Sequence, residues 1–326
     1  MTEYTKDAPP ETGISWPRAV AVIGAAGLIG SGVVERLAVE GLAETVHMID
    51  LRDNILDAHA IDISEAQILS GTSRTKLVVG PPADGSPVDL VIVAASAPET
   101  PDGDRRDFLL ANLRLLQRLV PDIERLSGTE GAVMLLSNPV DVLAESLRRL
   151  SNIDPDRIVG YSLNDSLRFR AAVARELLIA PDRVDGLVLG EHGNGQVPLF
   201  SALTVDGKPA DLDPAQRTSV TEDITGWFFR WSALKPGRSS GWTTPLGVAN
   251  IVRSMGEGKL HPATAWTRDR DGLPDSFVSL PARFTHRTVI AELGHISSTE
   301  RDQLIQAAKS VAAAADDALA ALDGES

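Results

Sequence analysis

The fold is decided by residues 19–50, which read AVAVIGAAGLIGSGVVERLAVEGLAETVHMID. The apolar run at 19–24 predicts a buried strand, because strands covered on both faces of a parallel sheet show continuous hydrophobic stretches. Residues 31–42 repeat apolar side chains at helical spacing and carry a glycine near their end, so they predict a helix. A second apolar run at 45–51 predicts another strand, and this order is typical of a βαβ unit.

Strand and helix patterns alternate through the rest of the first half. Apolar runs predict strands at 76–80, 89–95 and 131–139, and helical spacing predicts helices at 55–69, 106–126 and 140–150. Strands that alternate with helices in this way pair in parallel, with the helices covering both faces of the sheet. The first half therefore predicts an α/β fold built on a doubly wound parallel sheet, the Rossmann arrangement.

The second half shows a mixed pattern. Helices are expected at 166–178, 219–234, 244–258 and 300–322, with a strand at 184–190, half of a hairpin at 199–209, and strands with turns at 260–293. The 326 residues suggest two domains, at about 150 residues per domain. We expect a flexible N-terminal extension over 1–17, a Rossmann domain over 18–160 and an α+β substrate domain over 161–326.

A glycine-rich turn joins the first strand to the first helix. In GAAGLIG, Gly24 permits a tight turn, Gly27 lets a phosphate approach the backbone, and Gly30 allows the helix to pack closely on the strand. Leu28 and Ile29 open the helix, whose free N–H groups and positive dipole end attract a pyrophosphate. The spacing G-x-x-G-x-x-G also fits a plain glycine turn, so the motif alone is a weak signal.

An aspartate strengthens the dinucleotide interpretation. Asp50 ends the second strand, 20 residues after Gly30. A carboxylate there accepts hydrogen bonds from the adenosine ribose hydroxyls and repels a 2′-phosphate, although an aspartate in this place can also serve as a helix N-cap. Together the two features predict a cofactor site for NAD in preference to NADP.

The composition excludes several classes of protein. The 45 acidic residues outnumber 31 basic ones, and a net charge of −14 argues against a nucleic-acid partner. The chain has no cysteine, which excludes disulfides, thiolate metal sites and cysteine nucleophiles. The longest uncharged run, 19–34, is shorter than the ~20 residues of a membrane helix, and residues 1–18 lack the features of a signal peptide. We expect a cytoplasmic protein with no metal and no membrane partner.

Four further segments hold candidate catalytic residues. Asp165 and Arg168 in LNDSLRFR are three residues apart at a helix start and so share one face, as a surface ion pair would also do. His192 lies between glycines in GEHGNGQVP, where it is either a catalytic group or a solvated loop residue. Asn138 in LSNPVDV follows a parallel strand at the sheet edge where open sheets bind ligands. The segment DRRDFLLAN, 104–112, opens a long helix with paired arginines.

The ordered set of GAAGLIG, Asp50, R-x-D-F-L-x-x-N, SNPVDV, DSLRFR and GEHGNGQVP resembles the lactate/malate dehydrogenase family over residues 18 to about 320. The glycine motif and SNPVDV look most like malate dehydrogenases, whereas GEHG looks more like lactate dehydrogenases. The resemblance implies an NAD-dependent enzyme that interconverts a small 2-oxo acid and its L-2-hydroxy acid by hydride transfer. It also implies a homodimer or homotetramer.

The resemblance assigns a role to each candidate. His192 would exchange a proton with the substrate oxygen, Asp165 would orient its ring, and Arg168 would clamp the substrate carboxylate with its planar fork. By the same resemblance, Arg105 would polarise the ketone from a closing loop, and Ser240 would lie in the substrate pocket. Asn138 would bind the reacting oxygen and lie near the cofactor, and Asn112 would also lie near the cofactor.

Three positions depart from the family pattern. Gly160 and Asp165 are five residues apart where six are expected, which changes the loop before the aspartate. Arg105 has the expected spacing to Asn112, while Arg106 has the usual spacing from the preceding glycine, so we favour Arg105 but leave both open.

The third departure concerns the substrate side chain. Glu99, six residues before Arg105, stands where a malate enzyme is expected to carry an arginine for the second carboxylate. Facing carboxylates repel by several kcal/mol in a desolvated site, so oxaloacetate is disfavoured. If Thr100 faces the substrate the pocket is neutral, and these acids can also point to solvent. We expect a neutral or cationic substrate side chain.

Other functions are weighed against the same residues. A metal-dependent glycosidase with the same glycine motif would use a cysteine-containing site, which this chain lacks. A true malate dehydrogenase is the enzymatic alternative. A short-chain-type reductase would need a Tyr-x-x-x-Lys pair, but neither Tyr4 nor Tyr161 has a lysine four residues later. A non-catalytic nucleotide-binding protein on this fold would not need the candidates His192, Asp165, Arg168 and Asn138, all of which are present.

Overall fold

The computed structural model describes residues 17–72, 74–98, 105–236, 240–255, 259–285, 288–291 and 296–324. The predicted extension over 1–17 lies almost entirely outside these ranges.

A parallel sheet forms the first half of the molecule. Its strand order is β3-β2-β1-β4-β5-β6, with neighbouring strands parallel. The strands are β1 (Ala19–Ile23), β2 (Thr45–Ile49), β3 (Lys76–Val79), β4 (Leu90–Val93), β5 (Ala132–Leu135) and β6 (Ile158–Gly160). Because the order runs outward from β1 in both directions, the predicted doubly wound topology is confirmed.

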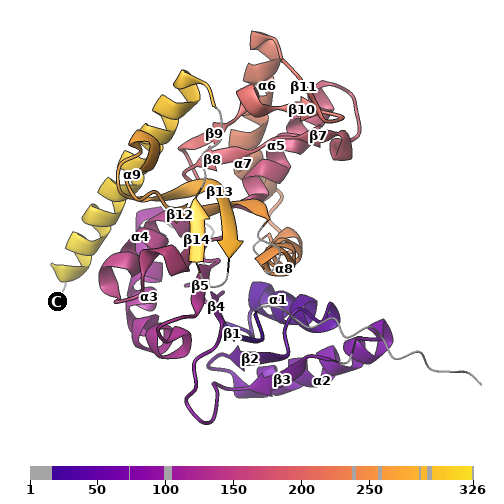
Figure 1. Cartoon of the computed structure of the whole chain (residues 1–326), viewed down its shortest axis with the longest axis vertical. Helices are drawn as coiled ribbons and strands as arrows, with labels where there is room; N and C mark the ends of the chain where they lie inside the picture. The colour runs from indigo at the N-terminus through magenta and orange to yellow at the C-terminus, as the bar shows by residue number, and fades with distance from the viewer. Residues whose placement is uncertain are drawn as a thin grey trace, which may run out of the picture.

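Helices cover both faces of this sheet (Figure 1). They are α1 (Leu28–Val39), α2 (Asp53–Ser70), α3 (Arg105–Ser127) and α4 (Val140–Leu150). Successive residues of β1 point to opposite faces. Val20 and Val22 belong to the core that contains α1 and α2, whereas Ala21 and Ile23 belong to the core that contains α3 and α4. Burial on both faces explains why β1 is a continuous apolar run.

The second half extends the sheet with antiparallel strands. β12 (Leu260–Trp266) pairs with β6 through Thr264 and Gly160, and with β13 (Phe277–Thr285) along its length. The other strands are β14 (Thr288–Ala291), β8 (Val188–Gly190) and β9 (Gln196–Pro198), with a small separate sheet of β7 (Val184–Asp185), β10 (Thr204–Val205) and β11 (Lys208–Pro209). Since strands of both halves join in one sheet, the division after residue 160 stays a prediction.

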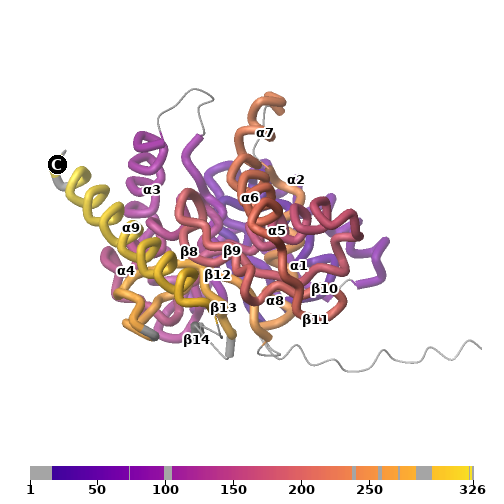
Figure 2. The backbone as a smooth tube through the Cα atoms, turned by 90° about the horizontal axis from the view of Figure 1, so that it is seen from above, coloured from indigo at the N-terminus to yellow at the C-terminus, as the bar shows by residue number. Residues whose placement is uncertain are grey.

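Helices pack around these strands. They are α5 (Leu163–Glu176), α6 (Pro214–Thr225), α7 (Trp227–Ala233), α8 (Thr243–Met255) and α9 (Ser298–Asp323), with 3-10 turns η1 (Pro155–Arg157), η2 (Pro181–Arg183), η3 (Phe200–Ala202) and η4 (Arg270–Gly272). Viewed from above, α9 runs past α4 toward β8 and β9 (Figure 2). The C-terminal helix therefore supports the hairpin that carries His192.

Two sequence expectations are wrong in detail. The helix expected at 219–234 is two helices that meet at Gly226. The strand expected at 184–190 is also divided, at residues 186 and 187. Gly186 lies so close to Phe169 that a Cβ there would lie 2.7 Å from the ring. β7 joins the small sheet, and β8 joins the large one.

Candidate active site

Three candidates from different segments meet at the start of α5. The His192 Nδ1 atom lies 2.5 Å from Asp165 Oδ2, and the Arg168 Nη1 group donates to Asp165 Oδ1 over 2.9 Å. The side chains of Asp165, His192 and Arg168 are 4%, 15% and 20% exposed, respectively. The aspartate is thus buried between its two partners, whereas the histidine and the arginine each keep a solvent-accessible part.

The surroundings favour a charged histidine. Burial lowers the pKa of His192, but the charge and hydrogen bond of Asp165, with the charge of Asp141, outweigh it and the pKa is raised. Burial acts in the opposite direction on Asp165 and raises its pKa. The charge and hydrogen bond of His192 and the charge of Arg168 outweigh burial, so the pKa of Asp165 is lowered. The pair is therefore suited to an ionised carboxylate that stabilises an imidazolium.

Two asparagines tie the carboxyl ends of β4 and β5 together. Asn112 is buried in α3, where its Oδ1 atom accepts from the Ala97 amide over 2.8 Å and its Nδ2 group donates to the Asn138 carbonyl over 3.2 Å. Asn138 follows β5, at the sheet edge predicted for ligands. Asn112 thus holds in place the backbone of both segments that border this edge.

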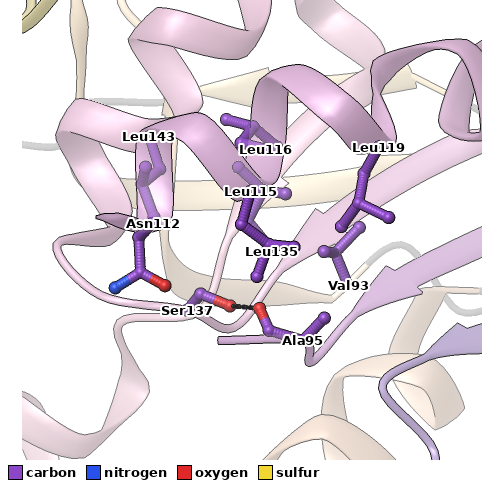
Figure 3. A pocket seen from close by; sticks show the side chains of 9 residues that line it. All are labelled: Val93, Ala95, Asn112, Leu115, Leu116, Leu119, Leu135, Ser137 and Leu143. Carbon is purple, nitrogen blue, oxygen red and sulfur yellow. Dashed lines mark hydrogen bonds between the residues drawn. The ribbon is translucent and has the colours of Figure 1, made fainter. Parts of the chain in front are cut away.

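A small cavity lies behind this edge (Figure 3). Nine residues line it, including Asn112, Ser137 and Ala95, and the Ser137 hydroxyl donates to the Ala95 carbonyl over 2.5 Å. Its volume of about 10 Å³ is close to what one water occupies, so it cannot admit a substrate. We interpret it as a packing feature that supports the loops after β4 and β5.

The glycine turn fits a dinucleotide. Gly24 has φ +88°, and a Cβ on it would lie 2.5 Å from the Ala95 nitrogen; one on Gly30 would lie 2.1 Å from the Gly24 carbonyl oxygen. Side chains are therefore excluded where the strand, turn and helix meet. Gly27 is the N-cap of α1 and offers no side chain to the first helical amides, here of Leu28 and Ile29. These amides remain available to a pyrophosphate.

Asp50 lies at the edge of this turn. Its Oδ2 atom accepts from the Ala26 amide over 3.2 Å, and its Oδ1 atom accepts from Arg52 Nε over 3.1 Å. Burial raises the pKa of Asp50, but the hydrogen bonds from Arg52 and Ala26 reverse this and the pKa is lowered. Asp50 is thus an ionised acceptor beside the cofactor turn, as expected, but Arg52 is a close cation that the sequence reasoning did not weigh.

The remaining sequence candidates are Arg105, Arg106, Glu99 and Ser240. Arg105 and Arg106 are both exposed in the first turn of α3, and Glu99 lies outside the described residues. Ser240 is half-buried before α8. A Cβ on the adjacent Gly241 would lie 2.8 Å from Leu28 Cδ2, so the Ser240 segment packs against the cofactor turn.

Two functional candidates were missed by the sequence reasoning. The Trp227 ring lies under the Arg168 guanidinium, with 3.8 Å from Arg168 Cζ to the ring centroid, and Trp231 stacks on Trp227. Asp141 is buried in the first turn of α4 and accepts a hydrogen bond from the His192 backbone amide. Trp227 belongs to the segment GWFFRW at 226–231, and Asp141 belongs to SNPVDV at 137–142. Neither segment has a spacing that would pair Trp227 with Arg168 or Asp141 with His192.

Comparison with known proteins finds lactate and malate dehydrogenases. Residues 18–160 match the model of the lactate/malate dehydrogenase NAD binding domain. L-lactate dehydrogenase B of Hordeum vulgare is 29% identical over 310 residues, which cover 90% of this chain and 88% of that protein. L-lactate dehydrogenase of Thermus aquaticus is 28% identical over 309 residues, covering 91% of this chain and 98% of its own. Residues 18–160 therefore match the NAD binding domain of the lactate/malate dehydrogenases, and the similarity to lactate dehydrogenases extends over about 90% of the chain.

A solved structure supports this similarity. Malate dehydrogenase from Salinibacter ruber superposes with a TM-score of 0.83 at 25% identity, over 94% of this chain and 100% of its own. The chain is therefore an NAD-dependent oxidoreductase of the lactate/malate dehydrogenase type. Within the described residues, no helix is long and apolar enough to cross a membrane, and no three His, Asp or Glu side chains are grouped as metal ligands.

Proposed function

We propose that the chain reduces a small 2-oxo acid to its L-2-hydroxy acid at the His192 centre, with a substrate side chain that is neutral or cationic. The observation that carries the proposal is the contact of His192 and Arg168 with one buried carboxylate, Asp165. This arrangement places a proton donor beside a carboxylate-binding group. It is what a 2-oxo acid requires, since its ketone and its carboxylate are adjacent.

Each side chain has a defined task. Asp165 occupies His192 Nδ1, which leaves Nε2 to give its proton to the substrate oxygen as negative charge develops there. Arg168 donates one Nη1 bond to Asp165 and retains N–H groups for the substrate carboxylate. NADH, held by the glycine turn and Asp50, supplies the hydride when bound. Asn138 orients the reacting oxygen.

Trp227 completes the carboxylate clamp. Its ring covers one face of the Arg168 guanidinium, and a guanidinium binds carboxylates with its edge. The ring therefore leaves the hydrogen-bonding edge accessible while it excludes water from one face. A cation–π contact of this kind contributes about 0.5–2 kcal/mol.

Two loop positions define the remaining specificity. Arg105 is proposed as the ketone-polarising residue, because it opens α3 and has the family spacing to Asn112, with Arg106 as the other candidate. Glu99 is proposed as the residue that disfavours a second substrate carboxylate. Ser240 is proposed to line the pocket beside the cofactor turn.

The proposed assembly is a homo-oligomer, a homodimer or a homotetramer. Ile61, Ile68 and Leu69 on α2 are 66%, 71% and 91% exposed, and Leu51 just before α2 is fully exposed. Exposed apolar groups gathered on one element are typical of interaction surfaces. Static light scattering with an Ile68→Asp variant tests this assembly.

We also propose the cytoplasm as the compartment, in keeping with a cysteine-free sequence.

The deciding experiment is NADH oxidation against a panel of 2-oxo acids: pyruvate, a branched 2-oxo acid, an amino or guanidino 2-oxo acid and oxaloacetate. We expect the highest kcat/KM with a neutral or cationic side chain, and a Glu99→Arg variant should shift preference toward oxaloacetate. A clear optimum for oxaloacetate in the unmodified protein would instead identify a malate dehydrogenase. No turnover of any of these acids would support a non-catalytic nucleotide-binding protein.

A further inference from the structure

Asp141 makes two short hydrogen bonds in the interior of the protein. Asp141 lies in the first turn of α4 and is 1% exposed. Its Oδ2 atom accepts from the His192 backbone N–H over 2.6 Å, and its Oδ1 atom accepts from the Thr264 hydroxyl over 2.5 Å. The carboxylate thus links α4, the His192 loop and β12.

This carboxylate is not explained by an ion pair. Glu145, one turn later on α4, is also fully buried, but it contacts both Arg148 and Arg149. Asp141 has no lysine or arginine partner among the described residues. Burying a carboxylate that has no lysine or arginine partner is costly, and the two hydrogen bonds offset part of that cost.

The His192 loop needs an external attachment. Glycines flank the histidine at 190, 193 and 195, and Gly190 has a left-handed φ of +84°. Hydrogen bonds within the loop, from the Glu191 N–H to the Gly195 carbonyl over 3.1 Å and from the Gly193 N–H to the Glu191 carbonyl over 2.8 Å, shape its turns. The His192 N–H is instead taken by an acceptor outside the loop. Asp165 holds the imidazole ring but does not touch the main chain of the loop in the contacts described above.

We propose that Asp141 is a second positioning carboxylate of the active site, which fixes the backbone of His192 while Asp165 fixes its ring. The inference rests on the proposed role of His192 as proton donor. A catalytic group must be held within about 0.5 Å of its productive position, and two attachments at different atoms achieve this better than one.

Asp141 also adds charge behind the imidazole. Burial raises the pKa of Asp141 to about 6, although the Thr264 hydrogen bond and the charge of His192 lower it in part. The charged groups around His192 are Asp165 and Arg168 from α5, Asp141 from α4 and the adjacent Glu191. Asp141 is one of the groups that raise the pKa of His192, whereas Arg168 lowers it.

Two substitutions separate position from charge. In Asp141→Asn, the amide oxygen still accepts from the His192 N–H and the amide nitrogen donates to the Thr264 hydroxyl, so the loop is held but the charge is lost. Asp141→Ala loses both. Glu145→Gln is the matched control, since it neutralises another buried acid of α4 that does not touch His192.

The readouts are the pH profile of 2-oxo acid reduction and NMR titration of the His192 ring in the NADH complex. Reduction needs protonated His192, so its rate falls as the pH rises through the His192 pKa. Asp141→Asn should move this fall to lower pH by about one unit, as expected for loss of a nearby buried charge. Asp141→Ala should lower kcat on the order of 10²–10³-fold, with the Kd for NADH nearly unchanged.

Glu145→Gln should leave both the pH profile and the His192 pKa unchanged, whatever it does to the melting temperature. Asp141→Asn with an unchanged His192 pKa, or Asp141→Ala with the kcat of the unmodified enzyme, would overturn the inference. If the unmodified chain reduces no 2-oxo acid, the proposed function fails. The NMR titration still decides the inference in that case, since it requires no turnover.

Discussion

Replacing Asp165 by asparagine should reverse the proton arrangement of His192. Arg168 Nη1 donates to Asp165 Oδ1, so the amide oxygen of the variant stays on this arginine. The amide NH₂ group must then face His192 Nδ1, which becomes an acceptor. The neutral ring is forced to carry its proton on Nε2, the nitrogen that must be free to take a proton from a 2-hydroxy acid.

The two directions of the reaction should therefore suffer unequally. A buried hydrogen bond to a charged group contributes about 1.5–3 kcal/mol, so its loss should reduce 2-oxo acid reduction by about 10- to 150-fold. Oxidation of the 2-hydroxy acid also needs the unfavourable tautomer and should fall on the order of 10³–10⁴-fold. His192→Ala should lower turnover on the order of 10²–10⁴-fold in both directions, with little change in NADH binding.

The assay is initial-rate kcat/KM in both directions for the unmodified enzyme, Asp165→Asn and a control, Asp185→Asn. Asp185 is also an acid paired with an arginine, Arg170, but its side chain is 73% exposed. The control should keep its activity. Oxidation by Asp165→Asn at a rate near that of the unmodified enzyme would refute the tautomer argument, and so would equal losses in the two directions.

The remaining predictions concern cofactor, loop and clamp. Asp50→Ser should narrow the preference for NADH over NADPH in kcat/KM. Arg52→Ala should widen this preference, because Arg52 is the cation beside the Asp50 carboxylate. Equal use of both cofactors by the unmodified enzyme would contradict the role given to Asp50. Arg105→Ala should lower kcat more than Arg106→Ala, and the opposite order would assign the loop role to Arg106. Trp227→Leu should raise the KM for the 2-oxo acid about 2- to 30-fold, as loss of about 0.5–2 kcal/mol implies, and an unchanged KM would remove Trp227 from the clamp.

Much of this protein is determined by local sequence. The apolar run at 19–23 specifies a strand buried on both faces, and the glycines at 24 and 30 occupy the backbone positions that tolerate no Cβ. Asp165 and Arg168 share a helix face by spacing alone, and the structure shows them in contact. The strand, the position of Gly30 and the Asp165–Arg168 contact were predictable because each depends on residues close in the chain, where geometry follows from helix and strand periodicity. The space beside Gly24, in contrast, is taken by the distant Ala95.

The tertiary structure decided the contacts between distant segments. His192 meets Asp165 across 27 residues and Asp141 across 51, and no spacing in the sequence encodes either approach. The strand expected at 184–190 is divided at Gly186, which lies against the Phe169 ring, and its two parts join different sheets. Trp227 in α7 meets Arg168 in α5, and no spacing in the sequence pairs these two residues. Such pairings arise when the sheet and its helices close around a common core, so a side chain's partners depend on the whole packing rather than on its neighbours in sequence.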